Sequence, residues 1–198
     1  IVARHESLRT TFERRDGEVR QRFAAADIGF ALQEHNLQTL DADARQAAVT
    51  QLTQAEARDA FDLSQGPLIR GRLLCLAEDE HILLVTQHHI VSDGWSVAVL
   101  IGEFNALYAA FSQQLDDPLP PLALQYADYA SWRQQHLQGE RLHAQVDFWK
   151  AHLDGAPALL ELPSDHPRPQ VQSYQGAALA LQLPAPLSAR LRRFSQQQ

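Results

Sequence analysis

The sequence has little cysteine, no methionine and no long apolar run. Cys75 is the single cysteine among 198 residues, so no disulfide can form within the chain, and we expect a reducing, cytoplasmic location. No signal peptide is visible, because charged side chains interrupt the first ten positions. No stretch approaches the roughly 18 consecutive apolar residues of a membrane span, and we therefore expect no membrane partner.

Basic residues are also in the minority. Lys and Arg number 17 against 24 Asp and Glu, which gives a formal net charge of −7 and argues against a nucleic-acid partner. Apolar residues make up 45% and charged residues 21%, as in an ordinary globular domain. The chain starts at Ile1 rather than Met, and we expect it to be a segment excised from a longer polypeptide.

The local patterns predict strands and helices that do not alternate strictly. We therefore expect an α/β fold, an α+β layered sandwich with a mixed sheet flanked by helices. Asp16-Gly17 predicts a tight hairpin, because glycine accepts a positive φ at little steric cost. The run 82–85 is so apolar that we place its strand in the middle of a sheet with both faces covered.

Helices are predicted where apolar residues recur with a helical period. The clearest period covers residues 95–111, and residues 43–60 form a second helix that Asp41 or Asp43 can cap. Further elements are expected as helices over 125–138, 141–153 and 185–194, and as a strand over 175–183.

The most informative segment lies between the apolar strand and the helix that follows it. His88 and His89 are adjacent, so in a strand they point to opposite faces, and only one can reach a given substrate. The same geometry argues against a metal site, which needs converging ligands. Asp93 can cap the helix, and Gly94 permits a sharp turn and close approach of a ligand. The residues alone leave open whether the histidines are catalytic or only structural.

Four motifs together resemble one known family. Residues 88–94 are similar to the HHxxxDG signature of condensation domains in nonribosomal peptide synthetases, within the chloramphenicol-acetyltransferase-like superfamily. Residues 4–12 resemble the family motif RHExLRTxF, residues 126–132 resemble YxDYAxW, and residues 61–68 resemble a further common stretch. The motifs stand in family order and cover nearly the whole chain.

The resemblance implies a domain organisation and an activity. Residues 1–172 would form the N-terminal lobe, incomplete at its start, and residues 173–198 the truncated start of the C-terminal lobe. The implied reaction is amide-bond formation between two thioesters, each on the phosphopantetheine arm of a carrier domain. The implied partners are the upstream and downstream carrier domains, an adjacent adenylation domain and the missing C-terminal lobe. No cofactor or metal is expected on this segment, and the segment alone is expected to be inactive.

The resemblance assigns a catalytic role to His89, and the local chemistry suggests roles for the residues around it. His89 would be the catalytic histidine, and the Gly94 backbone N–H a candidate oxyanion donor. His88 is expected to be buried and hydrogen-bonded. Asp93 is expected to hold the loop by pairing with an arginine, Arg9 as first choice and Arg4 as second. The alternative for each arginine is a solvated surface charge.

Two other functions are weighed against the condensation reaction. One is a stand-alone acyltransferase of the same superfamily that uses coenzyme A thioesters. The other is a non-catalytic lobe that only docks carrier or neighbouring domains. Gly94 favours a condensation domain over its epimerisation relatives, and His88 disfavours the heterocyclisation subtype, in which aspartates replace the histidines.

Overall fold

The chain is divided into two compact units. The computed structural model describes residues 1–172, 176 and 179–197. The first unit is Ile1–Lys150 and the second is Ala151–Gln198. A lobe boundary between residues 172 and 173 stays a prediction.

The first unit begins with a short helical turn and the expected hairpin. The turn η1 (Glu6–Arg9) leads into β1 (Thr10–Arg15), which pairs antiparallel with β2 (Glu18–Phe23). Asp16 has φ 54° and Gly17 has φ 85°, so both central residues adopt the left-handed conformation of a two-residue hairpin turn. The predicted hairpin is therefore confirmed.

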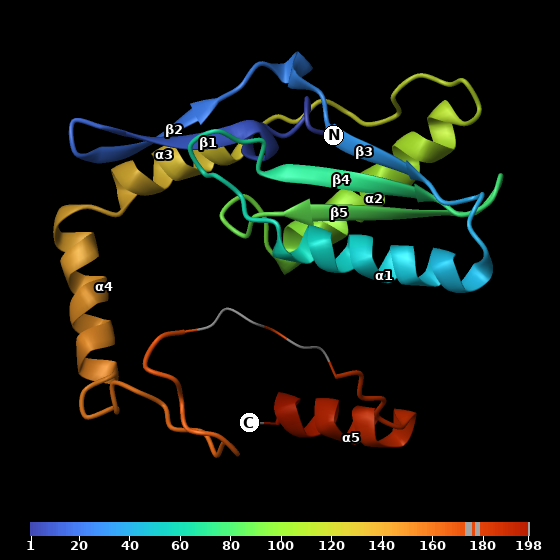
Figure 1. Ribbon diagram of the computed structural model, residues 1–198. Helices are drawn as coiled ribbons and strands as arrows, with labels where there is room; N and C mark the ends of the chain where they lie inside the picture. The colour runs from blue at the N-terminus through green and yellow to red at the C-terminus, as the bar shows by residue number, and fades with distance from the viewer. Residues whose placement is uncertain (173–175, 177–178, 198) are drawn as a thin grey trace. The chain divides into compact units, whose positions relative to one another are not determined.

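A three-stranded mixed sheet follows (Figure 1). After the short turn η2 (Ala26–Ile28), β3 (Ala31–Asn36) runs parallel to β4 (Ile69–Cys75), and β4 pairs antiparallel with β5 (His81–Gln87). The order β3-β4-β5 makes β4 the central strand. A central position for the run 82–85 was therefore a wrong prediction. Among the described strands β5 has one partner, and its residues are alternately exposed and half-buried.

Helix α1 (Ala42–Arg58) covers one face of this sheet and is held there by an ion cluster. Asp41 caps α1 by accepting the Ala44 N–H. At the other end, Glu56 accepts hydrogen bonds from Arg70 (2.7 Å) and Arg72 (2.5 Å) on β4. The two arginines point to the same face because they are two positions apart in the strand. Burial of the Glu56 carboxyl opposes ionisation, but the hydrogen bonds from Arg72 and Arg70 outweigh it and hold its pKa below 4.5.

Helix α2 (Gly94–Phe111) lies behind the sheet in Figure 1 and faces the opposite side. An apolar cavity of about 850 Å³ separates part of α2 from the sheet; side chains of both line it, among them Ile69, Leu83, Val97 and Phe104. By length and composition α2 could also cross a membrane, a property shared by core helices of globular proteins. Ala110 is the one buried residue of α2, so most of its apolar side chains are at least partly exposed within the described residues.

The remaining helices follow a proline-containing loop. Helix α3 (Tyr126–His136) is followed by α4 (Gly139–His152), close to the predicted bounds. In the second unit, α5 (Ala185–Gln196) matches the predicted helix. The strand predicted over 175–183 lies partly outside the described residues, and the described positions 176 and 179–183 are not in a strand.

Candidate active site

The loop between β5 and α2 continues the sheet and then turns onto the core. The His88 N–H donates to the Leu68 carbonyl, which extends the ladder of β4 and β5 by one residue. The Val91 N–H then bonds the His88 carbonyl and closes a turn. Val91 packs on a buried cluster of Val2, Leu8 and Ile69, so the loop is anchored to the first segment of the chain. Residues 89 and 90 are left exposed between these two anchors.

His89 presents its ring at the surface and is fixed by its own loop. Its Nδ1 atom lies 2.6 Å from the Ser92 carbonyl oxygen. A carbonyl oxygen only accepts hydrogen bonds, so Nδ1 must carry the proton. In the neutral ring Nε2 is then the basic nitrogen, and the loop has prepared one imidazole nitrogen as a proton acceptor.

His88 occupies a different environment from its neighbour. Its Nδ1 accepts the Ile90 N–H at 3.0 Å, and its ring meets Phe61 edge-on with centroids 6.0 Å apart. The side chain is hydrogen-bonded but half-buried rather than fully buried, and it does not line the cavity around His89. The two histidines thus have separate surroundings.

Phe61 connects His88 to the ion cluster of α1. The Arg70 guanidinium lies 4.0 Å from the centroid of the Phe61 ring, on the face of the ring. Arg70 is itself held by Glu56. The ring that flanks His88 is therefore supported by a largely buried charge pair.

Asp93 is the N-cap of α2. Its carboxylate accepts the Ser96 hydroxyl at 2.7 Å and the Ser96 N–H at 2.8 Å, and these hydrogen bonds hold the pKa of Asp93 below its usual value of 3.8. The Asp93 carboxylate is thus satisfied within the first turn of its own helix.

The expected pairing of Asp93 with an arginine was a wrong prediction. Arg9 bonds the Ala24 carbonyl and lies 3.5 Å from Glu6, while Arg4 pairs with Glu103 at 2.9 Å. Because Ser96 already supplies donors to Asp93, the carboxylate does not need a distant cation. Neither arginine is a solvated surface charge either, since both side chains are less than one-fifth exposed.

Gly94 is the first residue of α2. Its φ is not positive, and a Cβ at this position would meet no heavy atom of the described residues within 4 Å. The local fold therefore does not require glycine here. Close approach of a ligand to residue 94 stays a prediction, and its N–H belongs to the first turn of the helix, where N–H groups lack partners in the helix itself.

An open cavity of about 240 Å³ lies beside His89. One wall is the face of the hairpin that carries Thr10, Phe12, Gln21 and Phe23, and the strand register pairs Thr10 with Phe23 and Phe12 with Gln21. The other walls come from η1, the loop 89–93, the first turn of α2 and the first turn of α3. The cavity is mixed in polarity, and the ring of His89 has open space beside it.

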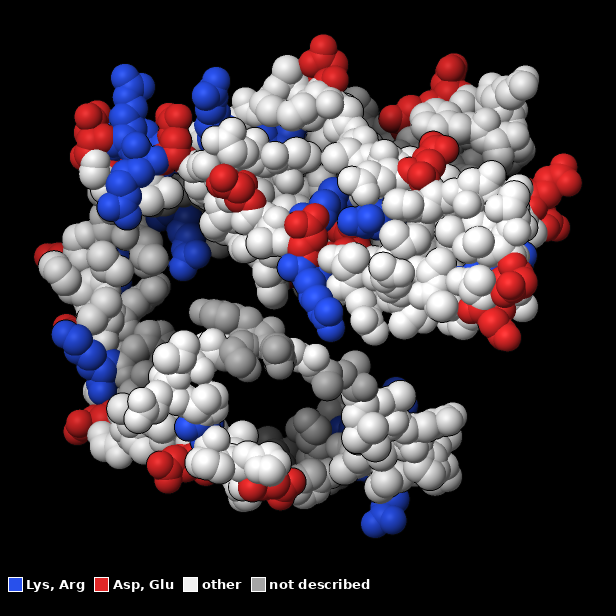
Figure 2. All heavy atoms as spheres, viewed as in Figure 1, with Lys and Arg blue, Asp and Glu red and all other residues white. Residues whose placement is uncertain are grey.

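Charges on the viewed face are mixed in sign. Figure 2 shows Lys and Arg side chains interspersed with Asp and Glu side chains. Within residues 1–172, 176 and 179–197, no three His, Cys, Asp or Glu side chains converge as a possible metal site.

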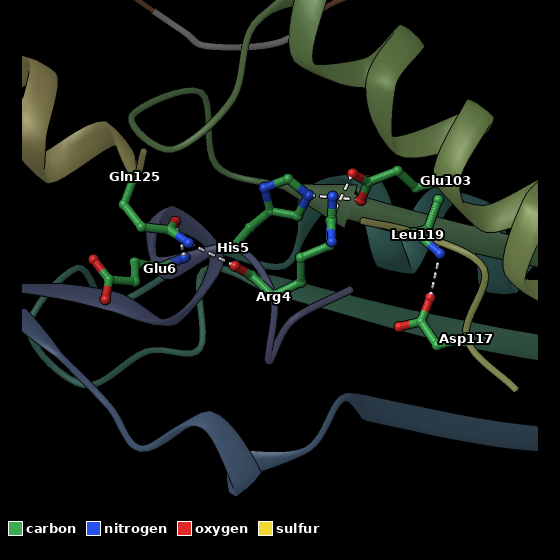
Figure 3. Close-up of polar contacts among 7 residues, drawn as sticks. All are labelled: Arg4, His5, Glu6, Glu103, Asp117, Leu119 and Gln125. Atoms are coloured by element: carbon green, nitrogen blue, oxygen red, sulfur yellow. Dashed lines mark hydrogen bonds and ion pairs between the residues drawn. The ribbon is translucent and has the colours of Figure 1, made fainter. Parts of the chain in front are cut away.

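A second group of polar residues supports the cavity from outside (Figure 3). Arg4 and His5 both contact Glu103 of α2, at 2.9 and 2.6 Å, and the Gln125 side chain bonds the backbone on both sides of His5. Hydrogen bonds from His5 and Arg4 lower the pKa of Glu103 despite its burial, which acts in the opposite direction. Sequence reasoning missed Glu103 and Gln125. Glu103 carried a signal, because it is the single charged residue within 94–111.

His89 lies just beyond the end of a sheet strand and beside an open cavity, with Nε2 available to accept a proton. This arrangement is suited to acyl transfer. The chain belongs to the condensation-domain family, whose model matches residues 1–198. It is 45% identical over 196 residues to malpibaldin synthetase of Mortierella alpina, a match that covers 99% of this chain and 4% of that protein. It is 44% identical over 198 residues to a linear gramicidin synthase of Brevibacillus parabrevis, a match that covers all of this chain and 4% of that protein.

Solved structures agree with this assignment. The fold is similar to the X-domain from teicoplanin biosynthesis, with a TM-score of 0.77 and 35% identity over 99% of this chain and 43% of that one. The chain therefore spans less than half of that domain and only 4% of each of the two synthetases. The predicted family and fold class are confirmed.

Proposed function

We propose that this chain supplies the histidine-bearing part of a condensation domain that forms amide bonds between carrier-bound thioesters. The donor is an acyl or peptidyl thioester, and the acceptor is the amine of an aminoacyl thioester. Both would be held on phosphopantetheine arms of carrier domains beside an adenylation domain. The observation that carries the proposal is the bond from His89 Nδ1 to the Ser92 carbonyl beside an open cavity.

The reaction balances with His89 as its proton carrier. The acceptor nitrogen attacks the donor carbonyl carbon, and a carbon–nitrogen bond forms as the carbonyl oxygen becomes an oxyanion. His89 Nε2 takes the proton that the nitrogen must lose. When the carbon–sulfur bond breaks, the departing thiolate takes a proton from the imidazolium, and the ring returns to its starting form.

Two further features support this chemistry. At the start of α2 the Asp93 carboxylate takes up the Ser96 N–H, and the Gly94 N–H is the group proposed to donate to the oxyanion. The thioester is already an activated acyl donor, so positioning supplies much of the rate. The remaining wall of the site is proposed to come from the second lobe, so the 198 residues alone should show no turnover.

The test is His89→Ala in the intact synthetase loaded with its own amino acids. Mass spectrometry of the phosphopantetheine arms follows transfer of the donor acyl group to the acceptor. We expect condensation to fall by about 100-fold or more, which is the usual contribution of a general base. The matched control is His143→Ala on the exposed face of α4, which should keep wild-type rates. Full transfer by the His89 variant would support a docking lobe instead.

A further inference from the structure

Gln125 joins two segments that are far apart in the sequence. Its Oε1 accepts the Glu6 N–H at 3.1 Å, and its Nε2 donates to the Arg4 carbonyl at 2.9 Å. One side-chain amide therefore clasps the backbone on both sides of His5, using its acceptor and its donor together. Figure 3 shows the amide of Gln125 lying against this stretch of backbone.

The clasp is continued on the other side by α2. Arg4 Nε lies 2.9 Å from one oxygen of Glu103, and His5 Nε2 lies 2.6 Å from the other. The Glu103 side chain is 12% exposed, so this cluster is largely removed from solvent. Gln125, the segment 4–6 and Glu103 thus form one connected set of polar contacts, which we call the Gln125 clasp.

Each segment that takes part in the Gln125 clasp also contributes residues that line the His89 cavity. Ser7 follows Glu6 directly, and Tyr126 and Ala127 follow Gln125 directly; all three line the cavity. Ser96, also in the lining, lies seven residues before Glu103, about two helical turns away on α2. A shift of the clasp would therefore move three walls relative to His89.

Helix α3 has little besides this contact to fix its position. None of its residues is buried, and Tyr126, Tyr129 and Trp132 are about half exposed. Apolar burial within the described residues therefore contributes little to its placement. The hydrogen bonds from Gln125 fix its first turn, which is the turn that faces the cavity.

We infer that Gln125 is a positioning residue for the condensation reaction: its amide sets the width of the His89 cavity by joining the first turn of α3 to the segment 4–6. This inference rests on the proposed function. Gln125 does not touch His89 or its Ser92 partner, so it acts on substrate placement and leaves proton transfer unchanged. A displacement of about 1 Å costs as much as 100-fold in rate when reactants must be aligned.

The test is Gln125→Glu in the intact synthetase. A carboxylate keeps the shape of the amide and can still accept the Glu6 N–H, but it cannot donate to the Arg4 carbonyl. The acceptor is supplied as a soluble pantetheine thioester of the amino acid that the adenylation domain loads, so that kcat and KM are measured separately. We expect kcat/KM to fall about tenfold, while the midpoints of the pH–rate profile stay at their wild-type values.

Matched variants complete the experiment. Gln135→Glu adds the same charge on the exposed part of α3 and should keep wild-type kinetics. If hydrogen exchange shows that Gln125→Glu unfolds, Gln125→Met removes both hydrogen bonds without adding charge and should show the same loss. A kcat/KM within twofold of wild type in a folded Gln125 variant, or a shifted pH midpoint, overturns the inference. Full turnover by His89→Ala together with a loss in Gln125→Glu would instead refute the proposed chemistry alone.

Discussion

The Nδ1 atom of His89 lies 2.6 Å from the carbonyl oxygen of Ser92, three residues further along the same loop. The neighbouring ring has the reverse hydrogen-bond role at the same atom, because His88 Nδ1 accepts a hydrogen bond from the Ile90 N–H. Two adjacent imidazoles are thus oriented by backbone groups of one short loop. A carbonyl selects the tautomer of one ring and an amide selects the tautomer of the other.

The first prediction concerns these tautomers. In the neutral state His89 should carry its proton on Nδ1 and His88 on Nε2, because the first faces an acceptor and the second a donor. Nitrogen-15 chemical shifts of labelled histidines in the complete condensation domain would show two distinct patterns. Substitution of His89 identifies its signals. The same tautomer in both rings would contradict the loop geometry.

The second prediction concerns Gly94. Gly94→Ala should leave hydrogen-exchange protection of α2 unchanged, because the added methyl group meets no described atom. Condensation should nevertheless fall about tenfold or more, since the methyl group would obstruct a substrate lying against the helix start. Gly102→Ala, in the same helix and equally open, is the control and should keep wild-type turnover. Normal rates in Gly94→Ala would remove residue 94 from the proposed site.

The third prediction follows from the Glu56 cluster. The pKa of Glu56 is lower in the folded protein than its ordinary value of 4.5, so the unfolded chain binds the proton more readily. The stabilisation by this group is therefore complete above about pH 4.5 and is lost as the pH falls through the folded pKa. Glu56→Gln leaves Arg72 without a counter-charge and leaves Arg70 with Asp59 alone, 3.7 Å away, and should cost about 3 kcal/mol.

Hydrogen exchange of β4 in the intact protein measures this effect. The wild type should lose protection in acid, whereas Glu56→Gln should start from lower protection and show a shallower dependence on pH. Glu18→Gln, in an exposed pair on the hairpin, is the control and should behave as the wild type. If β4 lost its protection over the same acidic pH range in Glu56→Gln as in the wild type, ionisation of Glu56 would not be the cause of that loss.

The fourth prediction concerns Gly71 in the central strand. A Cβ there would lie 2.7 Å from the Phe30 ring and 2.9 Å from the Leu84 carbonyl oxygen. Gly71→Ala should therefore destabilise the domain by about 1–3 kcal/mol through overpacking. Chemical denaturation of the complete condensation domain provides the measurement. Gly102→Ala should shift stability the other way by up to about 1 kcal/mol, because alanine is the better helix former. Equal stability of the two variants would be inconsistent with the packing around Phe30.

Features that depend on neighbouring residues could be predicted from the sequence. The hairpin turn at Asp16-Gly17 and the helix caps at Asp41 and Asp93 are decided within three or four positions, and all three appear where the pattern indicates them. The position of β5 could not be derived in the same way, because the apolar run at 82–85 does not reveal whether a further strand pairs with it.

Long-range polar contacts were the hardest part of the site to predict. Arg4 and Glu103 are 99 residues apart, and Gln125 reaches residues 119 and 121 positions earlier. Nothing in the local pattern names the partner of a half-buried arginine. Arg9 and Arg4 were predicted as partners of Asp93, but Ser96 in the first turn of α2 already satisfies its carboxylate.

The pairing of the hairpin limits how the His89 cavity can be altered. Gln21 and Phe23 face the cavity, and the residues between and before them, Arg20 and Arg22, face away. A slip of β2 by one position against β1 would exchange these faces, because side chains alternate along a strand. Two guanidinium groups would then stand near the imidazole and disfavour its protonated form. Changes of strand length in this hairpin can preserve the chemistry only in steps of two residues.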